Sequence, residues 1–220
     1  MVMVTLCWAA KGGSGTTVVT AALALGLRRH SLLVDLDGDL PAVLGLAESD
    51  RPGIDDWLRS AAPADHLGEL VVDVDASTSL LTRRRSHDEH ARGPTDEGRW
   101  GEFALWLRRQ HDDGIEVFVD GGTATPHDAM VAVADQVLLV TRPCYLSLRR
   151  ATRSTVRPTG VILVEEPGAS IKSRAVERCL GAPVVAKVSV DPAIARAVNS
   201  GLLAGRLPWA IGRELRGVAA

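Results

Sequence analysis

The chain has 220 residues, of which 46% are hydrophobic and 24% are charged. This is the composition of a globular protein with a sizeable core, and the length suits a single α/β domain over residues 1–220. The formal net charge of −2 gives the molecule as a whole no electrostatic reason to coat nucleic acid or an anionic membrane. Any such binding would have to come from a local patch.

Cysteine spacing and the lengths of the apolar runs argue against two further classes of protein. Cys7, Cys144 and Cys179 are widely spaced and form no CxxC pair, which is typical neither of a disulfide framework nor of a zinc site. No apolar run reaches the roughly 18 residues that a membrane-spanning helix needs. We therefore expect a cytoplasmic protein without stable membrane insertion, in which Cys7 and Cys144 are core thiols.

Short apolar segments alternate with helical ones along the whole chain. The segments expected to be strands are 4–9, 32–37, 70–74, 79–82, 115–120, 136–141, 160–165 and 183–188. The segments expected to be helices are 16–27, 54–60, 100–110, 126–134, 146–154, 173–180 and 192–199. This alternation predicts a doubly wound, mostly parallel sheet with helices on both faces. The polar run 83–98 is expected to be a mobile surface loop.

The segment 7–17, CWAAKGGSGTT, has the character of a phosphate-binding loop. Gly12, Gly13 and Gly15 stand between a predicted strand and a predicted helix, where successive backbone N–H groups can point at phosphate oxygens. The common pattern continues with a lysine that grips the outer phosphates and a Ser or Thr hydroxyl that holds Mg²⁺. Those two positions are Thr16 and Thr17 here, so the lysine is missing.

Carboxylates follow two of the predicted strands, at the edge of the sheet where the loop also lies. Asp35 and Asp37 end the segment LLVDLD, and Asp120 ends IEVFVD. Ligands of such sheets bind beyond the carboxyl ends of the strands. We therefore expect the glycine loop and these aspartates, which follow three strand ends, to form one site at this edge. We expect Asp35 to accept hydrogen bonds from the loop backbone rather than to act in catalysis.

These motifs resemble those of the ParA/MinD family, whose loop reads K-G-G-x-G-K-[ST] with an extra lysine at its start. Lys11, Gly12, Gly13, Gly15 and Thr17 match this pattern, whereas the second lysine is replaced. LLVDLD resembles the switch I segment of the family, VFVDGG resembles its Walker B strand, and VDPAIARAVNSG resembles the loop and helix beside its adenine. The resemblance covers nearly the whole chain.

The resemblance implies a P-loop NTPase fold that binds ATP or ADP with Mg²⁺. The residues it assigns to the nucleotide are Lys11, Gly12, Gly13, Ser14, Gly15, Thr16, Thr17, Asp191 and Pro192. It also implies that Thr17 and Asp120 organise Mg²⁺ and that Asp37 orients the attacking water. Lys11 would reach the partner's nucleotide in a face-to-face homodimer that depends on the nucleotide.

A loop without the second lysine is similar to that of the CpaE/TadZ branch, which positions the Tad pilus and secretion machinery. This similarity implies pilus, secretion or cell-pole partners and recruitment to the cell pole or the inner membrane surface. Loss of one charge-assisted hydrogen bond costs about 1.5–3 kcal/mol, or roughly 10- to 100-fold in affinity. Transition-state donors carry on the order of 10²- to 10³-fold in rate, so we expect weak or absent hydrolysis.

Three alternatives remain open at this stage. A scaffold of the same fold without nucleotide binding is suggested by Thr16 and by Glu165 or Glu166, which stand where the family often has an adenine-reading asparagine. A partition ATPase that binds nonspecific DNA is suggested by the arginines at 83–85 and at 149, 150 and 153, although a solvated face is favoured for these clusters. The C-terminal stretch 209–219 either docks onto the domain, which we favour, or lies on a membrane surface.

Overall fold

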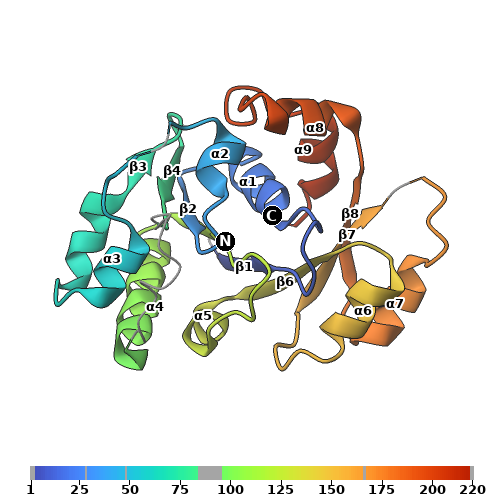
Figure 1. The fold of residues 1–220 in the computed structure, drawn as a ribbon, viewed down its shortest axis with the longest axis horizontal. Helices are drawn as coiled ribbons and strands as arrows, with labels where there is room; N and C mark the ends of the chain where they lie inside the picture. Colours follow the sequence, from blue (N-terminus) through green and yellow to red (C-terminus); the bar gives the residue numbers. More distant parts are fainter. Residues whose placement is uncertain (1–2, 28, 48, 84–95, 166, 219–220) are drawn as a thin grey trace.

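One sheet runs through the described part of this computed structural model, which covers residues 3–27, 29–47, 49–83, 96–165 and 167–218 (Figure 1). Its strands lie in the order β3-β4-β2-β5-β1-β6-β7-β8. All neighbours pair in parallel except β3 and β4, which are antiparallel. The predicted doubly wound, mostly parallel sheet is confirmed.

The elements of the described residues follow the predicted alternation. The strands are β1 Val4–Trp8, β2 Ser31–Asp35, β3 Val72–Asp73, β4 Thr78–Leu81, β5 Glu116–Asp120, β6 Gln136–Thr141, β7 Gly160–Glu165 and β8 Val184–Ser189. The helices are α1 Thr16–Leu25, α2 Leu40–Leu44, α3 Ile54–Arg59, α4 Glu97–Asp112, α5 Asp128–Val133, α6 Tyr145–Ala151, α7 Ser173–Leu180, α8 Pro192–Asn199 and α9 Trp209–Leu215. A 3-10 helix, Ala64–Leu70, follows α3.

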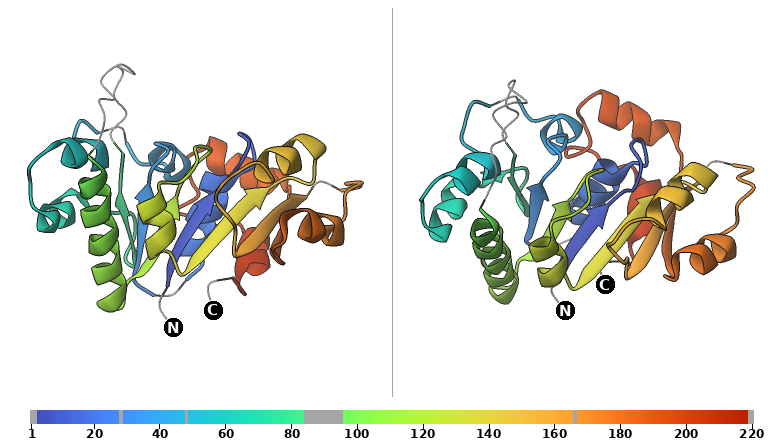
Figure 2. Two further views of the ribbon diagram at one scale, coloured as in Figure 1. Left: turned by 90° about the horizontal axis from the view of Figure 1, so that it is seen from below. Right: turned by 60° about the horizontal axis from the view of Figure 1, so that its bottom comes forward.

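Helices cover both faces of the sheet, as the rotated views in Figure 2 show. One face packs against α1, α2, α8 and α9, and the other packs against α3 to α7. The central strand β1 illustrates the alternation, because Cys7 faces α1 whereas Leu6 and Trp8 face the opposite layer. Apolar residues on both faces bury the strands, which makes them read as continuous hydrophobic runs in the sequence.

Two predicted strands differ from the structure by two or more residues at one end. The strand expected at 32–37 ends at Asp35, because the carboxylate of Asp35 accepts hydrogen bonds from the amides of Asp37, Gly38 and Leu40 and turns the chain out of the sheet. The strand expected at 70–74 is only Val72–Asp73, and the residues before it form the 3-10 helix. This short strand lies at the edge of the sheet, where pairing on one side alone gives little support to a longer one.

The predicted loop 83–98 ends earlier in the structure than expected, whereas Arg83 at its start lies outside the helices and strands, as predicted. Arg83 is fixed by two hydrogen bonds, to Asp55 and to the carbonyl of Leu36. At the other end α4 already begins at Glu97, because the carboxylate of Asp96 caps it by accepting a hydrogen bond from the amide of Gly98. Residues 84–95 lie outside the described part of the chain.

The C-terminal helix α9 docks onto the domain, as favoured from the sequence. Ile211, Leu215 and Val218 are buried in the layer that also contains α1. Trp209 does not join them, since it is 69% exposed with the guanidinium of Arg213 4.5 Å from its ring. No helix among the described residues is long and apolar enough to cross a membrane.

A close backbone contact between two loops gives a test of this packing. Gly45 ends α2 with φ of 77°, and a Cβ atom there would lie 1.7 Å from the carbonyl oxygen of Gly201. We expect Gly45→Ala to lower the free energy of unfolding by roughly 3 kcal/mol, because it adds a backbone clash to the strain of a positive φ. Denaturant titration measures the loss.

Gly114 is the matched control, because it has φ of 86° but an added Cβ would meet no atom of the described residues within 4 Å beyond its chain neighbours. Gly114→Ala should cost only about 1 kcal/mol, which is the strain of the left-handed conformation alone. Equal losses for the two variants would contradict the close approach of the two loops.

Candidate functional site

The glycine loop connects β1 to α1 in a conformation that needs glycine at two positions. Gly13 has φ of 75°, and Gly15, which is the N-cap of α1, has φ of 88°. Beyond the chain neighbours, no atom of the described residues lies within 4 Å of a Cβ built on either glycine, so the space in front of the loop is open. No side chain caps the first turn of α1, so its amide groups face this space and favour an anion.

Side chains of the loop brace its own backbone. The Ser14 hydroxyl is buried and donates to the carbonyl of Lys11 at 2.7 Å. The Nζ of Lys11 donates to the carbonyl of Gly12 at 3.3 Å, which leaves the ammonium group beside the mouth of the loop. Thr16 is buried, 6% exposed, and its carbonyl accepts a hydrogen bond from the hydroxyl of Thr20. Thr16 is thus accommodated without disturbing the first turn of α1.

Asp120 lies at the end of β5 with its carboxylate completely buried. One oxygen, Oδ1, accepts a hydrogen bond from the amide of Gly122 at 3.0 Å. The other, Oδ2, has no hydrogen-bond partner among the residues that the structure describes. Burial raises the pKa of Asp120 to about 7, and the nearby charges of Asp35 and Asp37 act in the same direction, whereas Thr17 and Gly122 oppose the shift.

Asp35 has the backbone role expected of it. Its carboxylate accepts three amide hydrogen bonds, the shortest from Gly38 at 2.6 Å. Burial raises the pKa of Asp35 to about 6 despite these bonds. Asp35 pairs directly with Asp120 in the sheet register, so the two carboxylates start from adjacent strand ends. Asp35 therefore shapes the loop that follows β2.

Asp37 lies in that loop, beyond the end of the strand, and its side chain is exposed. It lies directly against Gly122, because a Cβ atom built there would be 2.2 Å from the Cγ of Asp37. The amide of Leu36 donates to the carbonyl of Asp120 at 3.0 Å and ties the same loop to β5. The loops after β2 and β5 thus meet, and they bring Asp37, Asp120 and Thr17 to one place.

The residues expected near a purine base lie farther along the same edge. Asp191 caps α8 by accepting a hydrogen bond from the amide of Ala193 at 2.7 Å, and Pro192 is the first residue of the helix. Glu165 at the end of β7 pairs with Lys187 at 3.7 Å, and its carbonyl accepts from the amide of Val190. Glu166 lies outside the described residues.

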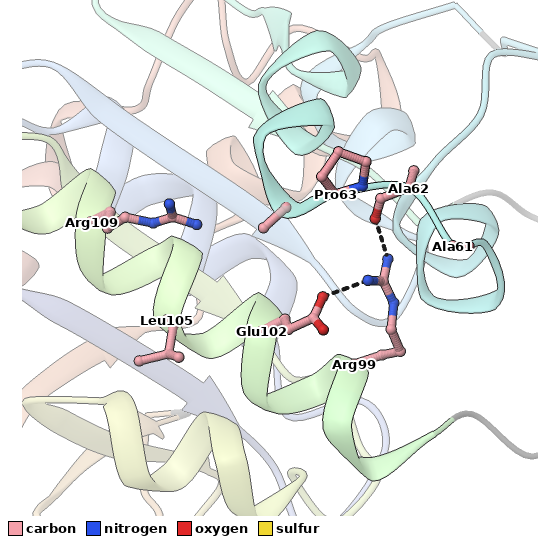
Figure 3. Close-up of a pocket in the computed structure, with 8 residues that line it drawn as sticks. Ala61, Ala62, Pro63, Arg99, Glu102, Leu105 and Arg109 are labelled. Atoms are coloured by element: carbon pink, nitrogen blue, oxygen red, sulfur yellow. Dashed lines mark hydrogen bonds and ion pairs between the residues drawn. The ribbon is translucent and has the colours of Figure 1, made fainter.

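The cavities of the described residues include two of similar volume. One, of about 450 Å³, is formed by the loops after β6 and β7, and its lining includes Arg142, Cys144 and Val164. The other, of about 410 Å³, lies between α4 and residues 61–64, where Arg99 points toward the carbonyl of Ala62 and pairs with Glu102 (Figure 3). Only the first lies at the strand ends that carry the glycine loop.

Cys7 and Cys144 were both expected to be core thiols. The structure confirms this for Cys7 and contradicts it for Cys144. Cys7 is buried, and burial raises the pKa of its thiol to about 12. Cys144 is half-buried at the start of α6, where hydrogen bonding to Ser147 lowers its pKa, with a smaller contribution from the charge of Lys11. Its place in the short loop between β6 and α6, three residues after the strand end, was the available signal that it belongs to the site edge rather than to the core.

The donors at this edge fit a magnesium ion that also binds phosphate. Among the described residues, no group of three or more His, Cys, Asp or Glu side chains is arranged to hold a metal by itself. The donors present are the hydroxyl of Thr17 and the unpartnered oxygen of Asp120, next to the open glycine loop. Mg²⁺ commonly takes only one or two protein ligands and completes its shell with water and phosphate oxygens, which matches this set.

The raised pKa of Asp120 gives a prediction about stability. The folded protein binds a proton at this carboxyl between the unfolded value of 3.8 and the folded value of about 7, so stability falls as the pH rises through this range. We expect Asp120→Asn to unfold less readily than the original protein at pH 8, by on the order of 2 kcal/mol, and the gain to vanish near pH 4. Thermal or urea unfolding without ligands measures it.

Asp75 provides a control of opposite sign. Hydrogen bonds from Ser77 and Thr78 outweigh burial and lower the pKa of Asp75, so its charged form stabilises the fold. Asp75→Asn should therefore lose stability at pH 8. A stability gain from Asp120→Asn that is the same at pH 4 and pH 8 would contradict the assignment.

Comparison with known proteins finds similarity in structure alone. No protein-family model matches the chain, and no curated protein matches its sequence. A ParA family ATPase from Chlorobium tepidum is 19% identical with a TM-score of 0.76, covering 97% of this chain and 96% of the other. MinD of Pyrococcus horikoshii, solved with Mg-ADP, is 21% identical with a TM-score of 0.74, covering 100% and 95%.

A third solved structure is an ATP complex of a McdA variant from Cyanothece, which is 16% identical with a TM-score of 0.71 and covers 98% of this chain and 95% of the other. Across these proteins the similarity spans nearly the full length of both chains. The chain has the fold of the ParA and MinD ATPases.

Proposed function

We propose that this chain is a ParA/MinD-like nucleotide-binding switch that binds ATP or ADP with Mg²⁺ and dimerises when the nucleotide is bound. The observation that carries the proposal is the open glycine loop beside the buried, half-satisfied carboxylate of Asp120. Solved structures with the same fold include one with Mg-ADP and one with ATP, which supports the same ligand class here. Residues 1–220 would act as one nucleotide-binding domain.

Each residue at the edge has a role in this proposal. The backbone of Gly12 to Thr17 holds the phosphates, and Thr17 with Asp120 holds Mg²⁺, which when bound neutralises phosphate charge. Asp37 is placed on the loop that touches Gly122, where it orients the attacking water. Lys11 contacts the nucleotide of a second copy, and Asp191 with Pro192 lies beside the base.

Thr16 sets the balance between binding and hydrolysis. The backbone cradle does not depend on the missing lysine, because Gly13 and Gly15 supply its geometry. Hydrolysis depends on charge placed against the transition state, and Thr16 brings none. The proposal is therefore a switch with weak or absent ATP turnover rather than an efficient enzyme.

For the cellular role we propose positioning of a larger assembly, with a Tad-type pilus or secretion apparatus as the candidate and the cell pole or inner membrane surface as its site. The loop without its second lysine supports this assignment. Exposed arginines on and after α6, at 149, 150 and 153, support partition on nonspecific DNA as a second candidate. Retention on DNA that requires ATP and is lost with added salt separates the two.

Isothermal titration calorimetry tests the ligand. We expect ADP and ATP to bind with Mg²⁺, and chelation of Mg²⁺ or Asp120→Ala to weaken the binding at least tenfold. Gly13→Val serves as the variant that fills the loop without changing any charge, and Gly114→Ala, far from the loop in sequence, is its control. If the original protein binds neither nucleotide, this proposal is wrong and the alternative of a scaffold without nucleotide binding is favoured.

Restoring the missing lysine gives a second prediction. Thr16→Lys should tighten Mg-ATP binding about 10-fold and raise single-turnover hydrolysis about 100-fold, because it returns a phosphate-gripping charge to an intact loop. Thr16→Met is the control for added length without charge and should give neither gain. Equal behaviour of the two variants would show that position 16 does not face the phosphates.

A further inference from the structure

Arg83 joins three segments at the edge of the site. It lies two residues beyond β4, and its side chain is 29% exposed. Its Nε donates to the carboxylate of Asp55 in α3 at 2.6 Å, and its Nη1 donates to the carbonyl of Leu36 at 2.7 Å. One guanidinium group thus links the end of β4, the first turn of α3 and the loop after β2.

The carbonyl that Arg83 binds belongs to the peptide group that leads into Asp37. The N–H of the same peptide group, that of Asp37, donates to the Oδ1 of Asp35 at 3.1 Å. The peptide between Leu36 and Asp37 is therefore held at its oxygen by Arg83 and at its nitrogen by Asp35. Because a peptide group is planar and rigid, these two bonds set the direction in which the side chain of Asp37 leaves the backbone.

The anchor of Arg83 is itself fixed. Asp55 is only 16% exposed in its side chain, and the amide of Ile54 donates to the carbonyl of Thr82 at 2.9 Å, which docks the start of α3 on the end of β4. At the other end of α3, Arg99 donates to the carbonyl of Trp57. It also donates to the carbonyl of Ala62 (Figure 3). With α3 held at both ends, the planar fork of Arg83 has a fixed direction.

We infer that Arg83 is a positioning residue for Asp37, holding the Leu36–Asp37 peptide in the orientation that points the Asp37 carboxylate at the space beside Gly122. Arg83 differs in this from the exposed arginines of α6, because both of its donor contacts are made to other parts of the fold. The catalytic part of this inference rests on the proposed role of Asp37, whereas the positioning part depends on the geometry alone.

Hydrogen exchange of the nucleotide-free protein tests the positioning. In Arg83→Met, which keeps the length of the side chain and removes both donors, we expect the amides of Asp37, Gly38 and Leu40 to exchange about tenfold faster. Amides in the middle of α1 should not change. Arg83→Lys should recover part of the protection, because its ammonium group keeps the charge and reaches one partner.

Arg51 supplies the matched control, because it is exposed and its guanidinium group makes a long hydrogen bond, 3.4 Å, to the carbonyl of Glu69, away from the loop after β2. Arg51→Met should leave exchange at 37–40 unchanged. Unchanged exchange in Arg83→Met would overturn the inference, and faster exchange throughout the protein would show a general folding role instead. Because the experiment uses the nucleotide-free protein, it tests the positioning role of Arg83 whether or not the protein binds nucleotide.

Single-turnover hydrolysis, measured in Thr16→Lys if the original rate is too low, tests the catalytic part. Arg83→Met should lower the rate about tenfold and leave the dissociation constant of Mg-ADP within about twofold. Arg83→Lys should restore part of the rate. A loss of Mg-ADP affinity as large as the loss of rate would make Arg83 a binding residue and contradict the inference.

Discussion

The buried carboxylate of Asp120 is the constraint around which the site edge is arranged. It ends the strand between β1 and β2, and only one of its oxygens has a hydrogen-bond partner among the described residues. A buried anion without full compensation is costly, which the raised pKa expresses. The fold tolerates this cost in the place where a cation would remove it, beside Thr17 and the open loop.

Neighbouring segments are tied to the same strand end. The carbonyl of Asp120 binds the amide of Leu36, and the loop after Asp120 touches Asp37 through Gly122. Because these contacts are direct, a movement of the chain at Asp120 would also shift the loop after β2. Under the proposed function, one nucleotide at the glycine loop would bias both loops together, as a nucleotide-dependent switch requires.

Much of this edge was predictable from the sequence because local signals define it. Apolar runs that end in glycines or aspartates mark β1, β2 and β5, and a parallel sheet brings their ends together without any further information. The backbone role of Asp35 also followed from its position. The left-handed conformations of Gly13 and Gly15 agree with the loop predicted from KGGSG.

The features of the site edge that could not be predicted depend on tertiary contacts, which no local sequence pattern reveals. Arg83 belongs to an arginine cluster in the sequence, but its partners, Asp55 and Leu36, come from two separate segments. Cys144 reads as a core thiol until the strand order places it near Lys11. The early end of β2 arises from three hydrogen bonds of one carboxylate, and strand propensity does not encode such a competition.

A crystal structure with ADP and Mg²⁺ tests the central claim most directly. The expected result places the phosphates on the amides of Gly13 to Thr17, with Mg²⁺ between the hydroxyl of Thr17 and the oxygen of Asp120 that lacks a partner among the described residues. Nucleotide bound elsewhere on the chain, or a loop that stays empty at saturating Mg-ADP, would contradict it.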